Sequence, residues 1–477
     1  MKIYYTSDVH GFFFPTDYLD KEYKNTGLFC QMADFSYDKN TLRIDGGDTL
    51  EGCAFVDMIH EKNDAKIIAD IMNEAGYDFY TLGNHDFNFG YDYLKSYVDS
   101  MNAKCLTANV IDKTGNLEIY PYVKFKMEDK KIGIIGLVTD WINLWERKEN
   151  LENFEIKNSY ETLKKYYKEI QDCDLKILIY HGGLEIDPKT KKILKDTDEN
   201  IGGKIAKEFD FDIILAGHTH TRFNENLYGT VFVENKANAV EYSLVDIGDE
   251  IAVKHIESIK KPDYRINKYQ DYNDVLQNIL DIPIAKLDHD LLPDTKINMA
   301  INGSKLADFI NKILINYTNS DISITSFANE IEGFRKEITQ RDVLLTYKFP
   351  NVPVTCEIDS KTLKDALEQN YTYIHYDEEK GFFINEKFLS PTIEHFNFDF
   401  FYGIEFDVDF KADDYNKISN IKFKGEKIKK NQKFKITMNN YRKTGAGNFT
   451  MYSNLKVIKE YQKEIKNIII DYLKEKK

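Results

Sequence analysis

Six short apolar runs in the first half of the chain, each bounded by polar or glycine residues, constrain the fold most strongly. They are KIYYTSD, TLRIDGGD, DFYTLGNHD, KIGIIGLV, KILIYHGG and DIILAGHTH, beginning at residues 2, 41, 78, 131, 176 and 212. Segments with apolar residues at helical spacing lie between them, for example over 65–77 and 159–172. Strand signals that alternate with helix signals are typical of a layered α/β domain.

The chain has 477 residues, which is long for one domain and sufficient for two. The regular alternation loosens over 262–295, where a helical stretch is followed by Pro283 and Pro293. We therefore predict a first domain over 1–261, a linker with a helix over 262–295, and a second domain over 296–477.

The predicted second domain mixes two kinds of pattern. Strand-like alternation occurs over 402–410 and 434–441. Amphipathic helices are predicted over 301–317, 360–371 and 457–477. No internal repeat is visible, so this half is expected to be one mixed domain.

Composition and charge exclude several classes of protein. The chain has 64 Lys and Arg against 79 Asp and Glu, a net charge of −15, which disfavours binding to a nucleic-acid polymer or an anionic membrane. The N-terminal MKIYYTSDVHG is typical of a strand and not of a signal peptide, and no run of about 18 apolar residues follows. Five cysteines without a CxxC pair fit reduced thiols. We expect a cytoplasmic protein, a monomer or weak oligomer.

Five of the apolar runs end in side chains that can bind a metal. The candidates are Asp8 and His10, Asp48, Asn84 with His85 and Asp86, His181, and His218 with His220. One Asp after a strand is usually a turn or helix cap, and one His is usually hydrogen-bonded. Loops converge at the carboxyl ends of strands in an open α/β sheet, however, and this many buried donors would be costly to leave unpaired. The repetition therefore indicates a metal site.

The donor types suggest which ions the site would take. Imidazole, carboxylate and amide donors without clustered thiols suit Mn, Zn, Fe, Co or Ni better than calcium. The donors outnumber what one four-coordinate ion can use, so we expect two divalent ions with one bridging carboxylate. Such a pair can hold a hydroxide and clamp the oxygens of an in-line displacement at phosphorus. Two cations would also invert the local field of an acidic protein.

The order DVH, GGD, GNHD, a strand-end His and GHTH resembles the calcineurin-like metallophosphoesterases. The second domain resembles that of their 5′-nucleotidase branch. This resemblance implies an α/β fold with an N-terminal four-layer αββα metallophosphoesterase sandwich and a C-terminal α+β 5′-nucleotidase-type domain that binds the nucleotide.

The same resemblance assigns roles to the strand-end residues. One metal would be held by Asp8, His10, Asp48 and His220. The other would be held by Asp48 as the bridge with Asn84, His181 and His218. His85 looks like the catalytic histidine that binds no metal and whose imidazolium stabilises charge on the phosphoryl group or the leaving oxygen.

Three stretches resemble the 2′,3′-cyclic-nucleotide 2′-phosphodiesterase/3′-nucleotidase group more than plain 5′-nucleotidases: GLVTDWINLWERKENL, NFDFFYGIEFDVDF and NNYRKTGAGNFTMY. In that group the last stretch forms part of the nucleoside pocket, which here would contain Tyr441, Arg442, Gly445, Gly447, Asn448 and Phe449. Small residues let the backbone approach a ligand, and an aromatic ring can stack on any base.

The resemblance adds three further candidates for substrate binding. Phe398 looks like the opposing face of a base sandwich, and Asn329 and Arg335 occupy places where relatives contact phosphate or ribose. Arg is a natural bidentate partner of phosphate. Core packing for either Phe and a plain surface position for Arg335 are the alternative interpretations.

One position departs from the typical 5′-nucleotidase pattern. Three residues after the catalytic histidine, where those enzymes have an Asp paired with it, this chain has Asn88. An amide cannot hold an imidazolium by charge, so the pKa of His85 should depend on Asp86 or other neighbours. The cyclic phosphodiesterase group also tends to carry Asn there. We therefore predict His85 and Asp86 as the catalytic residues.

These features predict a hydrolase of nucleotide phosphoesters that uses a metal-bridging hydroxide, a 2′,3′-cyclic-nucleotide 2′-phosphodiesterase/3′-nucleotidase. A 5′-nucleotidase acting on nucleoside 5′-monophosphates or UDP-sugars would use the same site. A non-catalytic nucleotide-binding scaffold would not need a full dinuclear site with an additional histidine. A sulfur-ester hydrolase of the same superfamily would not need a stacking pocket.

Overall fold

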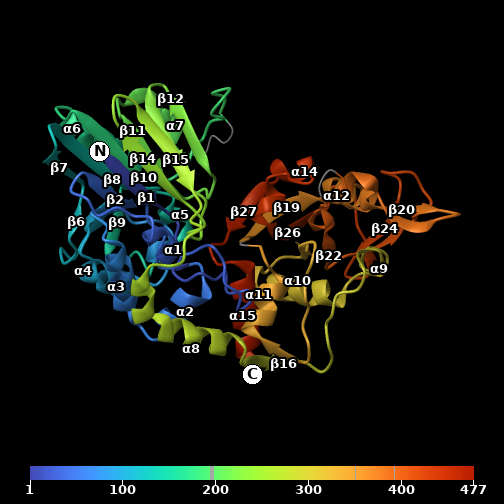
Figure 1. The fold of residues 1–477 in the computed structure, drawn as a ribbon. Helices are drawn as coiled ribbons and strands as arrows, with labels where there is room; N and C mark the ends of the chain where they lie inside the picture. The colour runs from blue at the N-terminus through green and yellow to red at the C-terminus, as the bar shows by residue number, and fades with distance from the viewer. Residues whose placement is uncertain (194–197, 350, 391–392, 477) are drawn as a thin grey trace. The chain divides into compact units, whose positions relative to one another are not determined.

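The computed structural model describes residues 1–193, 198–349, 351–390 and 393–476. It divides the chain into two compact units, Met1–Gln277 (unit 1) and Asn278–Lys477 (unit 2). Figure 1 shows the helices and strands of each unit. The predicted boundaries at 261 and 295 are finer than this division and stay a prediction.

Unit 1 is built on two mixed sheets. The first has the order β15 (Ile251–Ile256), β14 (Tyr242–Ile247), β1 (Lys2–Thr6), β2 (Thr41–Asp45), β3 (Phe79–Tyr80), β4 (Lys104–Leu106) and β6 (Ile119–Tyr120). The second has the order β12 (Phe223–Leu227), β13 (Thr230–Glu234), β11 (Ile213–Ala216), β10 (Leu175–His181), β8 (Lys130–Val138) and β7 (Tyr122–Met127). The central strands of each sheet run parallel, β1–β2–β3 in the first and β8–β10–β11 in the second, so their carboxyl ends share an edge.

Shorter elements complete unit 1. Its helices are α1 (Leu28–Met32), α2 (Ala54–Glu61), α3 (Ala65–Ala75), α4 (Tyr91–Ser100), α5 (Ile142–Trp145), α6 (Ser159–Ile170) and α7 (Gly202–Glu208), and β5 (Val110–Asp112) pairs with β9 (Phe154–Ile156). The helices predicted over 65–77 and 159–172 are confirmed as α3 and α6. Helix α8 (Gln270–Leu280) crosses the division between the units.

The core of unit 1 lies between its two sheets. Ile3 and Ile44 of the first sheet pack with Ile134 and Ile177 of the second, all completely buried. Successive residues of a strand face opposite sides, so the other face of each sheet needs its own cover.

Helices provide that cover on both sides. Leu178 of β10 packs with Leu163 of α6 and Ile205 of α7 on the outer face of the second sheet. On the outer face of the first sheet, the ring of Tyr80 meets that of Tyr97 in α4 edge to face at 5.9 Å. The predicted four-layer αββα arrangement is confirmed.

Unit 2 is built around one five-stranded sheet. Its order is β22 (Phe400–Tyr402), β17 (Ile322–Thr325), β26 (Lys433–Asn439), β19 (Pro353–Asp359) and β27 (Lys456–Glu460). Smaller sheets are β16 (Pro283–Lys286) with β18 (Glu337–Thr339), β20 (Ile374–Asp377) with β21 (Gly381–Ile384), and β23 (Glu405–Val408) with β24 (Ile418–Phe423) and β25 (Glu426–Lys427). The helices are α9 (Lys296–Asn302), α10 (Lys305–Thr318), α11 (Gln340–Thr346), α12 (Ser360–Asn370), α13 (Asn440–Lys443), α14 (Thr450–Ser453) and α15 (Ile465–Glu475).

Two large apolar clusters and a smaller one around Phe398 stabilise unit 2. Helices α10, α11 and α15 contribute to one of the large clusters, and α12 packs with strands β17, β19 and β26 in the other. Segregated helices beside a largely antiparallel sheet fit the predicted α+β class.

The closing helix is shorter than predicted. We expected it over 457–477, but it begins at Ile465, and Lys456–Glu460 form the edge strand β27 beside β19. The β-branched side chains of Val457 and Ile458 suit a strand, and backbone pairing with β19 outweighs the helical spacing of this short segment. Lys477 lies outside the described residues.

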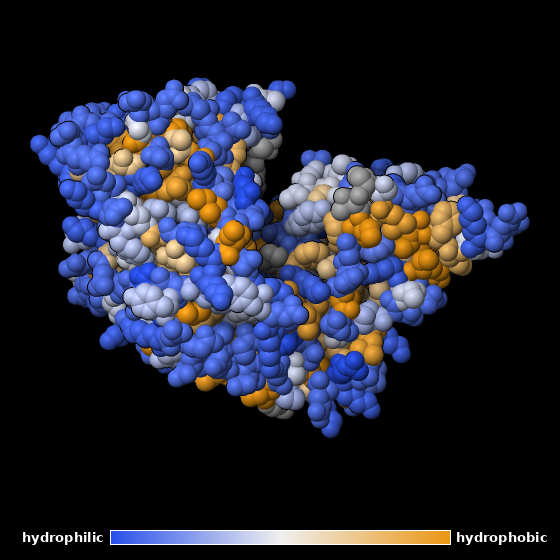
Figure 2. Space-filling model, viewed as in Figure 1, coloured by the Kyte–Doolittle hydropathy of each residue, from blue (hydrophilic) through white to orange (hydrophobic). Residues whose placement is uncertain are grey.

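The surface and the cysteines are those of an ordinary globular fold. Hydrophilic residues make up most of the face shown in Figure 2, with hydrophobic residues gathered in patches. No helix in the described part of the chain is both long enough and apolar enough to cross a membrane. All five cysteines lie in the described part of the chain, are buried and form no disulfide.

The contact between β8 and the end of β4 can be tested by adding one methyl group. A Cβ on Gly136 would lie 1.6 Å from the backbone oxygen of Leu106. Gly136→Ala should therefore lower the free energy of unfolding by about 1–3 kcal/mol, the cost of overpacking. Gly248→Ala is the control, because its Cβ would meet nothing nearer than 3.9 Å. Equal urea-unfolding midpoints for the two variants would contradict this packing.

Candidate metal centre

Loops after five strands of unit 1 carry the predicted ligands. Asp8 and His10 follow β1, Asp48 follows β2, Asn84 follows β3, His181 ends β10, and His218 and His220 follow β11. Strands β1, β2 and β3 are neighbours in one sheet, and β10 and β11 are neighbours in the other. Both sheets therefore supply residues to one cluster.

An unusual backbone conformation marks these positions. The φ angles are 54° for Asp8, 49° for His10, 58° for Asp48, 79° for His218 and 57° for His220. Residues other than glycine rarely adopt this left-handed region, which costs about 1–3 kcal/mol each. Backbone hydrogen bonds hold the turns, from Asp8 N to Gly47 O and from His10 N to Asp48 O, both 2.9 Å. Backbone strain at several residues of one cluster is typical of a functional site.

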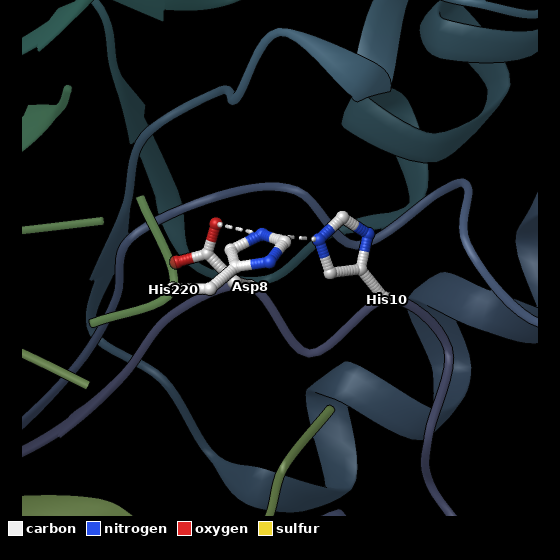
Figure 3. Close-up of side chains that lie close together, drawn as sticks. All are labelled: Asp8, His10 and His220. Carbon is white, nitrogen blue, oxygen red and sulfur yellow. Dashed lines mark hydrogen bonds and ion pairs between the residues drawn. The ribbon is translucent and has the colours of Figure 1, made fainter. Parts of the chain in front are cut away.

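Two groups of three side chains place their donor atoms within 4.8 Å of one another: Asp8 with His10 and His220, and Asp8 with Asp48 and His181. In the first group, Nε2 of His220 lies 3.1 Å from Nε2 of His10 and 3.5 Å from Oδ1 of Asp8. Figure 3 shows these three side chains with their contacts dashed. In the second, Nε2 of His181 lies 3.1 Å from Oδ2 of Asp48 and 4.0 Å from Oδ1 of Asp8.

Both carboxylates reach both groups. Asp8 belongs to each of them, and Oδ2 of Asp48 also lies 4.0 Å from Nε2 of His10. Asp8 is therefore a second candidate, beside Asp48, for the carboxylate that bridges two metal ions. The bridging role assigned to Asp48 stays a prediction.

Asn84 and His218 complete the cluster beside His181. Oδ1 of Asn84 lies 3.2 Å from Nε2 of His181 and 2.7 Å from Nδ1 of His218. The ring of Trp145 stacks on His218 with the centroids 5.4 Å apart. All seven predicted ligands therefore gather in one place.

Hydrogen bonds to the backbone determine which imidazole nitrogens face the carboxylates. A carbonyl oxygen only accepts, so Nδ1 of His10 donates to Glu51 O at 2.6 Å and Nδ1 of His181 donates to Gly46 O at 2.7 Å. Nε2 of each ring is then available to bind a metal. Metal-binding histidines commonly donate a hydrogen bond from their other ring nitrogen in this way. Oδ2 of Asp48 is buried beside Nε2 of His181, 3.1 Å away. The donor set fits a divalent cation.

Burial and mutual charge shift the pKa values within the cluster. Burial alone would raise the pKa of Asp8, but the hydrogen bond with His220 and the charge of His181 lower it to about 2. Burial alone would lower the pKa of His181, but the charge of Asp48 and a hydrogen bond with it raise that pKa to about 10. His181 would hold a divalent cation through neutral Nε2, because ligating imidazole must be neutral.

His85 lies at the side of this cluster. Its backbone N–H donates to Oδ1 of Asp48 at 2.7 Å, and its ring centroid is 5.6 Å from that of His10. Its Nδ1 lies 3.2 Å from Oε2 of Glu51. Sequence reasoning missed Glu51, which sits three residues after a predicted ligand and belongs to no recognised motif.

Asp86 also has a structural role, which we did not predict. Its carboxylate accepts hydrogen bonds from the backbone N–H groups of Asp48, Thr49, Leu50 and Gly83, at 3.1, 2.9, 3.0 and 2.8 Å. These bonds join the loop after β2 to the loop after β3. We expected the pKa of His85 to depend on Asp86 or other neighbours. In the structure both oxygens of Asp86 accept from the backbone of the ligand loops, so Asp86 holds these loops, and its catalytic role stays a prediction.

Two of the predicted nucleoside residues in unit 2, Arg442 and Phe449, are buried. Arg442 is 1% exposed, and its side chain pairs with Asp399 and donates to Ala446 O and Phe396 O. Its guanidinium lies 4.3 Å from the centroid of Phe449, which stacks on Tyr452. In this structure Arg442 and Phe449 hold the turn together.

The glycine turn itself is tight. Gly445, Gly447 and Asn448 have φ angles of 89°, 71° and 67°. A Cβ on Gly447 would lie 2.2 Å from Oδ1 of Asn397, so this glycine is required by packing. Tyr441 is 41% exposed and Asn448 is exposed as well, so these two side chains are open to a ligand.

The other substrate candidates are dispersed. Phe398 packs with Tyr373, in a different apolar cluster from Phe449, so the two do not form a base sandwich in this structure. The side chain of Asn329 donates a hydrogen bond to Ile393 O and accepts one from the backbone N–H of His395, so it joins its own loop to the one that holds these two residues. Arg335 is exposed. Substrate binding by the unit 2 residues stays a prediction.

Two family profiles match the chain. Residues 1–222 match the calcineurin-like phosphoesterases, and residues 283–454 match the 5′-nucleotidase C-terminal domain. The chain is a calcineurin-like phosphoesterase with a 5′-nucleotidase C-terminal domain. This confirms the predicted family and the predicted enzyme class, a hydrolase of phosphoric ester bonds.

Curated relatives of this phosphoesterase have low sequence identity to it but match it over nearly its whole length. It is 25% identical to the trifunctional nucleotide phosphoesterase protein YfkN of Bacillus subtilis over 100% of this chain, and it spans 38% of that protein's length. It is 21% identical to the 2′,3′-cyclic-nucleotide 2′-phosphodiesterase/3′-nucleotidase of Haemophilus influenzae, over 99% of this chain and 84% of that protein.

Solved structures share the fold over the whole chain. A candidate 5′-nucleotidase from Staphylococcus aureus, solved with α-ketoglutarate, has a TM-score of 0.72 and 28% identity, covering 99% of this chain and 96% of that one. The NAD nucleotidase of Haemophilus influenzae has a TM-score of 0.65 and 16% identity, covering 100% and 96%. The similarity to the NAD nucleotidase, at 16% identity, shows only a shared fold.

The role assigned to Asp86 predicts a loss of stability. Asp86→Ala leaves four buried N–H groups without their acceptor, so the free energy of unfolding should fall by about 2–4 kcal/mol. Asp129→Ala, at an exposed position, should change it by less than about 0.5 kcal/mol. Urea unfolding measures both, and an Asp86→Ala variant as stable as the control would refute the role.

Proposed function

We propose that this phosphoesterase hydrolyses nucleotide phosphoesters as a 2′,3′-cyclic-nucleotide 2′-phosphodiesterase/3′-nucleotidase. The observation that carries the proposal is the cluster around Asp8 and Asp48, with histidine donors within 4.8 Å and His85 alongside. The similarity to a Haemophilus influenzae enzyme of that name over nearly the whole chain supports this choice of substrate.

Two divalent ions are the proposed cofactors. One set of ligands is Asp8, His10, Asp48 and His220, and the other is Asp48, Asn84, His181 and His218. When bound, such ions supply Lewis-acid polarisation of a phosphoryl oxygen and a water of lowered pKa. A donor set of nitrogen and oxygen atoms suits Mn, Zn, Fe, Co and Ni.

The protein's own groups have separate tasks in this proposal. The carbonyl oxygens of Gly46 and Glu51 orient the rings of His181 and His10. His85, fixed by its backbone bond to Asp48, offers an imidazolium to the charge that develops on the phosphoryl or leaving oxygen. We assign nucleoside recognition to the stretch of unit 2 that contains the exposed ring of Tyr441, because base stacking needs an accessible aromatic face.

A 5′-nucleotidase is the second candidate. It is favoured by the likeness to the Staphylococcus aureus candidate 5′-nucleotidase, at 28% identity over nearly the whole chain. Both reactions use the same donor cluster, and they differ in which oxygen leaves beside His85.

A substrate panel separates the two candidates. With Mn²⁺ added, the proposed function predicts faster turnover of 2′,3′-cyclic AMP and 3′-AMP than of 5′-AMP, measured by release of the product over time. Faster turnover of 5′-AMP would assign the second candidate. Hydrolysis of none of the three would contradict both.

Loss of one ligand and removal of metal should each abolish the activity. His181→Ala should lower kcat/KM by more than about 100-fold, beyond the loss typical of residues that only support a ligand. The matched control is His289→Ala, an exposed histidine of unit 2, which should leave the rate unchanged. EDTA should stop turnover and Mn²⁺ should restore it. Turnover that survives either treatment would refute the assignment of the cluster.

A further inference from the structure

Glu51 contacts two histidines of the site, one through its main chain and the other through its side chain. Its backbone oxygen accepts a hydrogen bond from Nδ1 of His10 at 2.6 Å. Its carboxylate Oε2 lies 3.2 Å from Nδ1 of His85. The two paired side chains are 11% and 19% exposed, so this ion pair is largely shielded from water. One residue thus serves a predicted metal ligand through the main chain and the predicted catalytic histidine through the side chain.

Other acidic or amide groups near His85 are engaged elsewhere. Both oxygens of Asp86 accept backbone N–H groups of the ligand loops. Glu146 accepts from the backbone N–H of Arg147 and from Nδ2 of Asn150. Asn88, at the position where an Asp was expected from typical 5′-nucleotidases, is a neutral amide and cannot support an imidazolium by charge.

We propose that Glu51 is the positioning residue of His85 and takes the place of the acid missing at Asn88. Its carboxylate oxygen Oε2 lies 3.2 Å from Nδ1 of His85, a contact that restrains the ring and leaves Nε2 for the substrate. This inference rests on the proposed phosphoester hydrolysis.

The geometry allows the side-chain role to be tested separately from the main-chain role. Replacing the side chain of Glu51 leaves a carbonyl oxygen at the same place, so the bond to His10 can persist. Glu51→Ala removes both the charge and the acceptor. Glu51→Gln removes the charge and keeps the length of the side chain, with an amide oxygen in place of a carboxylate oxygen. Glu149→Gln is the matched control, an exposed glutamate on the same unit.

Kinetics on 2′,3′-cyclic AMP with Mn²⁺ form the first test. Glu51→Ala should lower kcat by about 10- to 100-fold, part of the contribution of a general acid–base group, with KM changed by less than about threefold. Glu51→Gln should fall between Glu51→Ala and wild type. In a His85→Ala background, Glu51→Ala should cause no further loss, because a positioning residue acts only through its partner. A wild-type kcat in Glu51→Ala, or fully additive losses, would overturn the inference.

A structural readout keeps the inference testable even if no nucleotide is turned over. In a crystal structure of Glu51→Ala, the ring of His85 should change its orientation, while Nδ1 of His10 stays bonded to the carbonyl of residue 51. The manganese content should equal that of wild type, which excludes collapse of the ligand cluster. A His85 ring in its original orientation would overturn the positioning role. A displaced ring in a protein whose wild type hydrolyses no nucleotide would refute the proposed function and leave the positioning role standing.

Discussion

The structure depends on two carboxylates held side by side where water barely reaches them. Asp8 is completely buried, Asp48 is 1% exposed, and each lies within 4.0 Å of imidazole nitrogens. Two buried negative charges repel each other and lose their hydration, which makes such a pair costly unless positive charge joins it. The histidines supply part of that charge, and divalent ions would supply more. The function of the first domain follows from this requirement.

The fold keeps these groups together by rigid means. Parallel strands of two packed sheets end at neighbouring loops, and the left-handed turns at Asp8 and Asp48 direct their side chains into the cluster. Asp86 binds the backbone of both ligand loops through four N–H groups. Strained turns of this kind persist only where the surrounding structure over-determines them. The packed αββα core therefore sustains the conformations on which the site depends.

Much of this arrangement could be predicted from the sequence, because the carboxyl ends of parallel strands share an edge. The direction of single side chains could not. Asp86 follows His85 directly, yet the short helical turn there sends it to the backbone of another loop, and Glu51 reaches the site only because of the turn after Asp48. In unit 2, Phe449 matched a base-stacking motif, but its ring packs against the guanidinium of Arg442 and the ring of Tyr452. Such outcomes depend on tertiary packing, which spacing along the chain does not encode.

The claim on which the account depends most is that this cluster binds a pair of divalent cations. Anomalous X-ray diffraction from crystals grown with Mn²⁺ tests it directly. We expect two manganese peaks about 3.5–4 Å apart, with ligand atoms from Asp8, Asp48 and the histidines around them. Crystals soaked in Mn²⁺ that show no anomalous peak among these side chains would contradict it.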